Sequence, residues 1–179
     1  MTDMRMRADP GTGYPGRTYR FYTGTPIFKF GYGLSYSTYS YEFTSATQSS
    51  LYMNKTVSLQ PVKDSQRTIS YDISKMEAKH CQELTFSAAV RVSNHGPMAG
   101  RHAVLLFLRR PNLHGGRPTK QLIGFESVHL EAGEKAHVAF PLRPCEHLSR
   151  NGEDGKMLVD EGSHFLVVGD QEHEFSIMG

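Results

Sequence analysis

The aromatic side chains of this sequence gather in its first 43 residues, a segment that cannot bury them by itself. Of the 10 Phe and 9 Tyr residues in the 179-residue chain, 11 lie there. Pro10, Pro15 and Pro26, with glycines among them, interrupt every helical window in this stretch. Because each aromatic ring offers roughly 150–250 Å² of surface for burial, residues 1–35 are expected to form an irregular arm that needs a partner surface.

Beyond the arm, the sequence changes to alternating patterns that are typical of half-buried strands. A first strand is expected near Tyr36, a polar loop over residues 44–66 and a short strand over residues 68–73. The clearest alternation runs over residues 84–92. Its apolar positions, which are predicted to face a core, are Leu84, Phe86, Ala88, Val90 and Val92.

The C-terminal half contains a predicted hairpin. Residues 122–130 and 135–142 flank four turn-forming residues, which favours two antiparallel strands joined by a short loop. Along the first of these strands the apolar side chains switch from one set of alternating positions to the other, which predicts a bulge at Glu126 and Ser127. The other strand patterns of this half span residues 103–108, 164–168 and 172–177.

Together these patterns favour an all-β fold. About seven short strands, with no amphipathic helix longer than two turns, predict an antiparallel β-sandwich over residues 36–179, preceded by the arm of residues 1–35. A chain of 179 residues is also too short for an eight-stranded barrel enzyme, which needs about 250 residues.

Charge and hydropathy argue against two classes of partner. The net charge is +2, from 20 Lys and Arg against 18 Asp and Glu, and the two signs are interspersed, so no basic stripe is expected to bind nucleic acid. No run of 18 apolar residues is present to cross a membrane. Residues 1–10 lack the apolar centre of a secretory signal, which leaves the compartment of an isolated chain open.

The motifs that suggest catalysis or cofactors have simpler explanations. The glycines of residues 11–16 match a dinucleotide-binding pattern, but neither a strand nor a helix is expected beside them. His129 and His137 supply only half of a metal site. The carboxylates lie in polar turns, and neither Ser35 nor Cys81 lies in the strained turn of a nucleophile. We therefore expect no catalytic, cofactor-binding or metal-binding residues.

Two local features depend on where the chain works. Cys81 and Cys145 either form a disulfide, worth on the order of 4 kcal/mol in the chain-entropy model, or remain as two buried thiols. Asn54 begins an Asn-Lys-Thr sequon, which carries a glycan only in a secreted protein.

Several motifs resemble one known family. GYPGRTYRFY at residues 13–22 and FKFGYGLSY at residues 28–36 are similar to the segment that leads into the C-terminal fibronectin type III-like domain of plant-type β-xylosidases/α-L-arabinofuranosidases, which are family 3 glycoside hydrolases. QLIGFESVHLEAGE at residues 121–134 and FLVVG at residues 165–169 resemble later strands of that domain. The likeness spans nearly the whole chain and implies an immunoglobulin/fibronectin type III-like sandwich.

The resemblance also implies a module without catalytic residues. In that family the nucleophilic Asp lies in an N-terminal barrel and the acid/base Glu in a following α/β sandwich, and no residue of this sequence matches either. Members are secreted and act on xylo-oligosaccharides and in some cases arabinosides. A parent enzyme in the extracellular space or cell wall is therefore implied, where a glycan and a disulfide both fit. Many members carry extra cysteines that residues 44–80 lack, which leaves the pairing of Cys81 with Cys145 open.

The arm supplies the candidate binding residues. In the family it would lie across the catalytic domains of the same chain, where its interleaved rings and guanidinium groups can stack or donate charge-assisted hydrogen bonds. The alternatives are a carbohydrate-binding module that stacks tyrosines on sugar rings, and a protein-interaction domain with open sheet edges. In an isolated chain the arm should be poorly ordered or expose apolar surface. The predicted docking residues are Tyr14, Arg17, Tyr19, Arg20, Phe21 and Tyr22.

Overall fold

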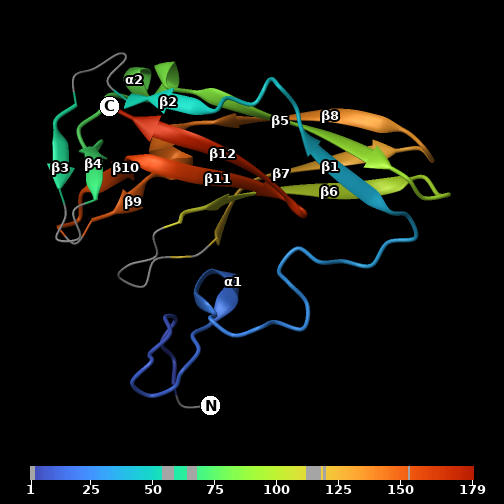
Figure 1. The fold of residues 1–179 in the computed structure, drawn as a ribbon, viewed down its shortest axis with the longest axis horizontal. Coiled ribbons are helices and arrows are strands. Elements are labelled where there is room, and N and C mark those ends of the chain that lie inside the picture. The colour runs from blue at the N-terminus through green and yellow to red at the C-terminus, as the bar shows by residue number, and fades with distance from the viewer. Residues whose placement is uncertain (1–2, 54–58, 64–67, 112–117, 119, 153) are drawn as a thin grey trace.

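The computed structural model describes residues 3–53, 59–63, 68–111, 118, 120–152 and 154–179. These residues form an all-β fold, as predicted, with strands in three sheets (Figure 1). The five-stranded sheet has the order β2 (Ser50–Tyr52), β12 (Gln171–Met178), β11 (Gly162–Val168), β6 (Gly100–Arg109) and β7 (Lys120–Leu130). The three-stranded sheet has the order β1 (Tyr39–Phe43), β5 (Phe86–Asn94) and β8 (Lys135–Leu142). A four-stranded sheet has the order β3 (Pro61–Lys63), β4 (Ile69–Asp72), β10 (Met157–Asp160) and β9 (Arg150–Asn151).

The hydrophobic core lies between the five-stranded and three-stranded sheets. All five apolar positions predicted over residues 84–92 are buried, so the inward face of β5 is confirmed. Val104 and Leu106 of β6 and Phe175 of β12 reach the same core from the opposite sheet. Burial of apolar surface contributes about 25 cal/mol per Å², so this layer of side chains stabilises the sandwich.

Every segment predicted as a strand contains one, although the first strand begins at Tyr39 rather than near Tyr36. The described residues also contain β2, β3, β9 and β10, so they form twelve strands where about seven were predicted. The four additional strands have only two to four residues each. Such short segments show no reliable alternation in a sequence.

The prediction of a loop over residues 44–66 is wrong in two places. Its described part includes β2 and β3, and the side chains of Leu51 and Met53 are buried. β2 pairs in parallel with β12, with Leu51 opposite Ile177. The far end of the chain thus provides the edge that makes this polar stretch a strand, which local composition cannot reveal.

The hairpin predicted around residues 131–134 is also wrong. β7 pairs with β6, and β8 pairs with β5, so this turn connects the two main sheets. The buried Asn94 side chain fixes the crossing, because its amide donates hydrogen bonds to the carbonyl oxygens of Met98 (2.8 Å) and Glu131 (3.1 Å). Two strands that are adjacent in sequence and amphipathic can either pair or face each other across a core, and their patterns are alike in both cases.

The predicted bulge is present in β7 but three residues earlier than expected. The register of β6 and β7 shifts between Leu106, opposite Gly124, and Phe107, opposite Leu122, so Ile123 is the extra residue. Gly124 faces the core beside Phe140. Phe125 points outward and is 69% exposed, although its apolar side chain suggested the inward face.

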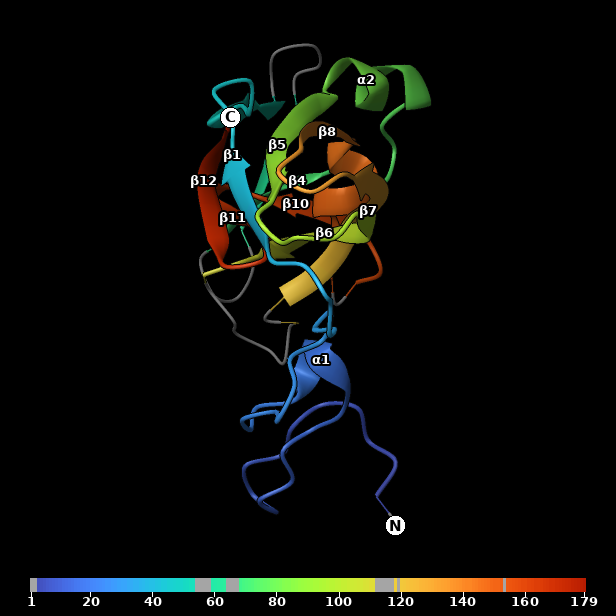
Figure 2. The same ribbon diagram turned by 90° about the vertical axis from the view of Figure 1, so that its right-hand side faces the viewer.

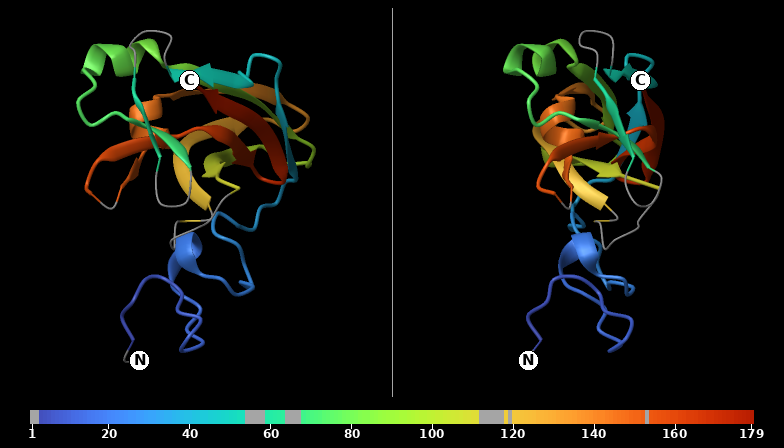
Figure 3. Two further views of the ribbon diagram at one scale, coloured as in Figure 1. Left: turned by 60° about the vertical axis from the view of Figure 1, so that its left-hand side comes forward. Right: turned by 90° about the vertical axis from the view of Figure 1, so that its left-hand side faces the viewer.

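The arm projects from the sandwich on the side of the five-stranded sheet, and the N-terminus lies far from the strands in every view (Figures 2 and 3). It carries α1 (Thr18–Phe21) and an isolated bridge between Asp9 and Tyr14. Two further short helices, α2 (Ala78–Glu83) and η3 (Pro144–Leu148), belong to the sandwich. The disulfide between Cys81 and Cys145 joins these two helices, with their Cα atoms 5.9 Å apart.

Candidate functional site: the aromatic arm

The path of the arm depends on a tight turn at Gly16. This residue has a φ of +83°, and a Cβ atom there would clash with the carbonyl oxygen of Phe21. The turn is held by backbone hydrogen bonds from Arg17 to Met6 (2.9 Å) and from Thr23 to Pro15 (2.9 Å). Glycine is therefore required where the chain doubles back before α1.

An aromatic stack attaches the arm to the sandwich. The rings of Tyr19 and Phe30 lie parallel with centroids 4.2 Å apart, and both meet the ring of Phe107 in β6 edge to face. The backbone N–H of Leu122 in β7 donates a 3.1 Å hydrogen bond to the Tyr19 hydroxyl. Gly31 follows with a φ of +87° and lies so close to Leu105 that a side chain would clash with it.

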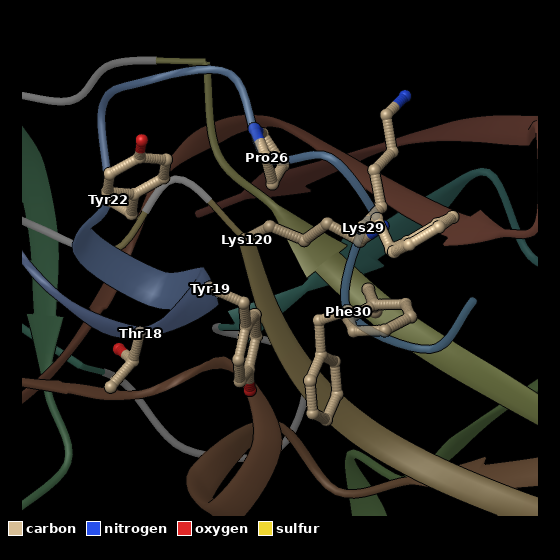
Figure 4. Close-up of a pocket in the computed structure, with 9 residues that line it drawn as sticks. Thr18, Tyr19, Tyr22, Pro26, Lys29, Phe30 and Lys120 are labelled. Atoms are coloured by element: carbon tan, nitrogen blue, oxygen red, sulfur yellow. The ribbon is translucent and has the colours of Figure 1, made fainter. Parts of the chain in front are cut away.

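A cavity of about 550 Å³ opens beside this stack (Figure 4). Tyr19 and Phe30 form one wall, Tyr22 and Pro26 lie across from them, and the side chain of Lys120 enters from β7. The complete lining is Thr18, Tyr19, Tyr22, Pro26, Phe28, Lys29, Phe30, Phe107 and Lys120. The cavity therefore combines aromatic walls with the side chain of Lys120, while the Lys29 ammonium points away from it.

Lys120 places positive charge in a partly buried, apolar setting. The Lys120 ammonium lies 3.9 Å from the centroid of the Phe107 ring, an arrangement that favours a cation. Burial lowers the pKa of Lys120, and the neighbouring charge of Lys29 lowers it further, while Glu172 opposes the shift. A ligand or partner surface with acidic groups and apolar contacts would suit this site.

Much of the arm is exposed, as predicted for an isolated chain. Ile27, Leu34 and Tyr36 are 92%, 93% and 90% exposed. The rings of Phe28 and Tyr32 stack on each other at 5.0 Å, yet both remain mainly in solvent. Phe28 also lines the cavity, and Tyr32 and Leu34 line a neighbouring cavity that shares Phe30, Phe107 and Lys120 with it.

The predicted docking residues divide into three groups in the structure. Tyr14 and Arg17 turn inward on the arm, where the Arg17 Nε donates a 2.7 Å hydrogen bond to the Tyr14 hydroxyl. Tyr19 and Tyr22 line the cavity. Arg20 and Phe21 line a separate cavity on the other side of α1, with the guanidinium of Arg20 over the Phe21 ring.

Sequence reasoning missed the contribution of the sandwich to this site. Lys29 and Phe30 lie within the motif of residues 28–36, which suggests no role for them, and no local pattern points to Phe107 or Lys120. Tyr19 and Leu122 are 103 positions apart, so only the fold brings them together. The one available signal is Phe107, a large ring in the strand predicted over residues 103–108.

The two histidines that were considered as metal ligands lie in different sheets. His129 lies opposite Arg101 in one sheet, whereas His137 lies opposite Arg91 in the other. Among the residues that the structure describes, no group of three or more His, Cys, Asp or Glu side chains could hold a metal ion.

The sequon residue Asn54 lies outside the described residues. Within the described part of the chain, no helix is both long and apolar enough to span a membrane.

Sequence comparisons place this fold among known enzymes. Residues 102–172 match the family described as Fibronectin type III-like domain. The chain is 48% identical over 174 residues to "Probable beta-D-xylosidase 7" of Arabidopsis thaliana, covering 96% of this chain and 22% of that protein. It is 41% identical to "Beta-xylosidase/alpha-L-arabinofuranosidase 1" of Medicago sativa subsp. varia, covering 99% of this chain and again 22% of the relative. The chain thus spans about a fifth of the length of these relatives.

Solved structures agree with the sequence comparisons. A structure titled "GH3 exo-beta-xylosidase (XlnD) in complex with xylobiose aziridine activity based probe" superimposes with a TM-score of 0.75 at 25% identity, covering 99% of this chain and 22% of that one. A β-glucosidase of Listeria innocua with a TM-score of 0.64 and 21% identity shares the fold. The chain therefore has a fibronectin type III-like fold and is similar, over nearly its whole length, to one part of plant β-xylosidases and β-xylosidase/α-L-arabinofuranosidases.

Proposed function

We propose that this chain is a non-catalytic module that positions and stabilises the catalytic domains of a β-xylosidase-like enzyme in the same polypeptide. The observation that carries the proposal is the apolar surface of the arm, where Ile27, Leu34 and Tyr36 are almost fully exposed. Contiguous exposed apolar surface commonly marks an interaction site. The relatives are several times longer than this chain, so each has further domains that such a surface can meet.

The proposed setting is the breakdown of xylan or xylo-oligosaccharides outside the cell. The names of the relatives support the substrate class, since they are β-xylosidases and α-L-arabinofuranosidases. The disulfide between Cys81 and Cys145 supports an oxidising compartment, because disulfides persist in secreted proteins and are rare in the cytosol.

Complementation tests the proposal. The purified chain is assayed on aryl xyloside and aryl arabinoside, alone and after mixing with the separately produced catalytic domains of a relative. We expect no hydrolysis by the chain alone, and a gain in the thermal stability or activity of the catalytic domains on mixing. Hydrolysis by the chain alone, or no effect on the catalytic domains over a wide concentration range, would contradict the proposal.

Matched variants locate the surface in that assay. The double substitution Leu34→Ser and Tyr36→Ser should weaken the complementation, because both side chains are exposed on the arm. Phe125→Ser is the control, since Phe125 is also exposed but belongs to the sandwich strand β7. An equal loss with Phe125→Ser would assign the contact to the sheet rather than to the arm.

A second candidate function is direct binding of a sugar, which the cavity of about 550 Å³ favours. Its aromatic walls can stack on a sugar ring while Lys120 donates hydrogen bonds to hydroxyl groups. Titration with xylobiose, followed by NMR, tests this function. Saturable shifts that Tyr22→Ala abolishes would support it, and unchanged spectra at high sugar concentration would remove it.

A further inference from the structure

A neighbouring cavity adjoins the aromatic-walled cavity beside the arm. Its volume is about 480 Å³. Residues 29–35 of the arm line it from one side, and Arg101 and Leu105 of β6 line it from the sandwich. Both cavities fall in the range of about 300–1,000 Å³ that binding pockets occupy, so each has room for bulky side chains of a partner. The residues common to both linings are Lys29, Phe30, Phe107 and Lys120.

Three basic side chains line these two cavities. Lys29 and Lys120 line both, and Arg101 lines the neighbouring one. Among the lining residues that the structure describes, neither cavity has an Asp or a Glu. Lys29 and Arg101 are exposed, and neither forms an ion pair within the described part of the chain. Three positive charges thus lie on the surface that the arm and β6 share.

Two carboxylates of the sandwich do not neutralise this surface. The Glu172 carboxylate opposes the lowering of the Lys120 pKa, yet it accepts hydrogen bonds of 3.0 Å and 2.6 Å from the guanidinium of Arg109. Asp170 precedes β12 and accepts a 3.2 Å hydrogen bond from the side-chain amide of Gln171. Neither carboxylate forms an ion pair with the three basic groups, so the surface keeps an excess of positive charge.

The partial burial of Lys120 makes its charge costly. Desolvation lowers its pKa, and the charge of Lys29 lowers it further. The Phe107 ring, with its centroid 3.9 Å from the ammonium, stabilises the cation only in part, because a ring face carries a partial negative charge rather than a full one. A carboxylate from outside this chain would complete the neutralisation.

Exposed apolar side chains lie beside these charges. Phe28 lines the first cavity and Tyr32 the neighbouring one, yet they are 67% and 59% exposed. Leu34 also lines the neighbouring cavity and stands almost wholly in solvent. A partner that is only apolar would leave the basic groups without counterions, and one that is only acidic would leave these side chains in water.

We propose that the surface of the catalytic domains that covers the arm is acidic as well as apolar. The inference rests on the proposed function and adds the chemistry of the partner. Bulky apolar side chains of the partner enter the two cavities, while Asp or Glu carboxylates pair with Lys29, Arg101 and Lys120. Such complementarity speeds the approach of the right partner and disfavours a basic one.

Binding at two salt concentrations tests the inference. The probe is the catalytic part of "Probable beta-D-xylosidase 7" of Arabidopsis thaliana, produced without the part that this chain matches and checked for folding by circular dichroism. Isothermal titration calorimetry measures its Kd for the chain in NaCl at low and at high concentration. We expect the Kd to rise by about tenfold at high salt, because screening weakens charged contacts more than apolar ones.

Charge reversal locates the contacts. Lys29→Glu and Arg101→Glu should each raise the Kd by about fivefold at low salt, because an attraction at the edge of the interface becomes a repulsion. Lys79→Glu is the matched control, since it makes the same change of charge at an exposed position of α2. α2 and α1 lie on opposite sides of the sandwich (Figures 1 and 2), so the Kd of this control should not change.

Cross-linking provides a direct readout of the same contacts. A water-soluble carbodiimide joins an amine to a carboxylate that touches it, and mass spectrometry then identifies the joined residues. We expect links from Lys29 to Asp or Glu residues of the catalytic part, and none from Lys79.

The possible results separate this inference from the docking module itself. A Kd that is insensitive to salt and to charge reversal, but that rises when Leu34 and Tyr36 are both changed to Ser, would overturn the acidic partner and leave the docking module intact. No binding at either salt concentration would overturn both. Dimers of the chain alone that Leu34→Ser and Tyr36→Ser abolish, in the absence of binding to the catalytic part, would assign this surface to a second copy.

Discussion

The sandwich and the arm use the same kinds of side chain with opposite results. Phe86, Phe140 and Phe175 of the sandwich are at most 5% exposed, whereas Leu34 and Tyr36 of the arm are at least 90% exposed. The sandwich strands satisfy their backbone groups with one another and can bring two apolar faces together. The arm has few backbone hydrogen bonds of its own, so it has no second layer to cover its rings. Apolar side chains are therefore expected to be buried only where the backbone that carries them pairs with neighbouring strands.

The largest effect should come from truncating a core ring. Phe175→Ala removes a ring that is packed against Phe86 and His164, and we expect a loss of about 3–5 kcal/mol in the free energy of unfolding. Phe28→Ala, an exposed ring of the arm, should change it by less than about 0.5 kcal/mol. Urea unfolding followed by circular dichroism measures both. Similar losses would show that the arm is part of the cooperative core.

Removing the disulfide should cause the second largest loss in the free energy of unfolding. The double substitution Cys81→Ala and Cys145→Ala frees two helices of the sandwich that are 64 positions apart, and we expect a loss of about 2–4 kcal/mol. The rate of chymotrypsin cleavage within the arm should not change, because the disulfide does not touch it. Faster cleavage of the arm in the folded variant would show that the two regions are coupled.

A smaller effect should come from the contact that joins the two regions. Tyr19→Phe removes the acceptor for the backbone N–H of Leu122 and should weaken docking of the arm by about 1 kcal/mol. Hydrogen exchange at the Leu122 amide measures this loss. Tyr22→Phe is the control, since Tyr22 is exposed and its hydroxyl forms no hydrogen bond with the described residues of the sandwich. Equal protection at Leu122 in wild type and Tyr19→Phe would show that the stack alone holds the arm.

The smallest expected effect is a loss of stability of the sandwich at acid pH. His164 is buried, its Nδ1 donates to the carbonyl oxygen of Gly162, and burial is the main cause of its lowered pKa. The unfolded chain therefore binds a proton more readily than the folded one. Stability attributable to His164 is complete above about pH 6.5 and falls as the pH drops towards the folded pKa. The lowered pKa values of His102 and His147 act in the same direction.

Unfolding midpoints between pH 7.5 and 5 measure this slope. We expect His164→Phe to flatten it relative to wild type. A slope that is identical in the two proteins would assign the acid sensitivity to other groups.

The sequence was sufficient for the regular strands and insufficient for their partners. Alternation over residues 84–92 predicted the buried face of β5, because a strand with one wet face repeats every two residues. The same alternation in β7 and β8 could not show whether they pair or oppose each other, and Asn94 decides that through its hydrogen bonds. Local patterns describe faces, whereas pairing depends on distant parts of the chain.

Of the candidate site, only the residues that the arm contributes could be predicted from the sequence. The motifs of residues 13–22 and 28–36 directed attention to the arm, and Tyr19 and Tyr22 do line the cavity. Phe107 and Lys120 come from the sandwich, and no local signal connects them with residues so far away in sequence. A binding cavity formed between two regions requires the three-dimensional arrangement of both.

The short strand β2 has a consequence for self-association. By pairing in parallel with β12, it occupies backbone groups along one border of the five-stranded sheet. An open border of this kind is a template on which another molecule can add a strand, the first step towards aggregates. Ser50–Tyr52 cover the border at Ser176–Met178 and leave only a strand of three residues as the new edge, and such a short edge strand offers little backbone for another molecule to pair with.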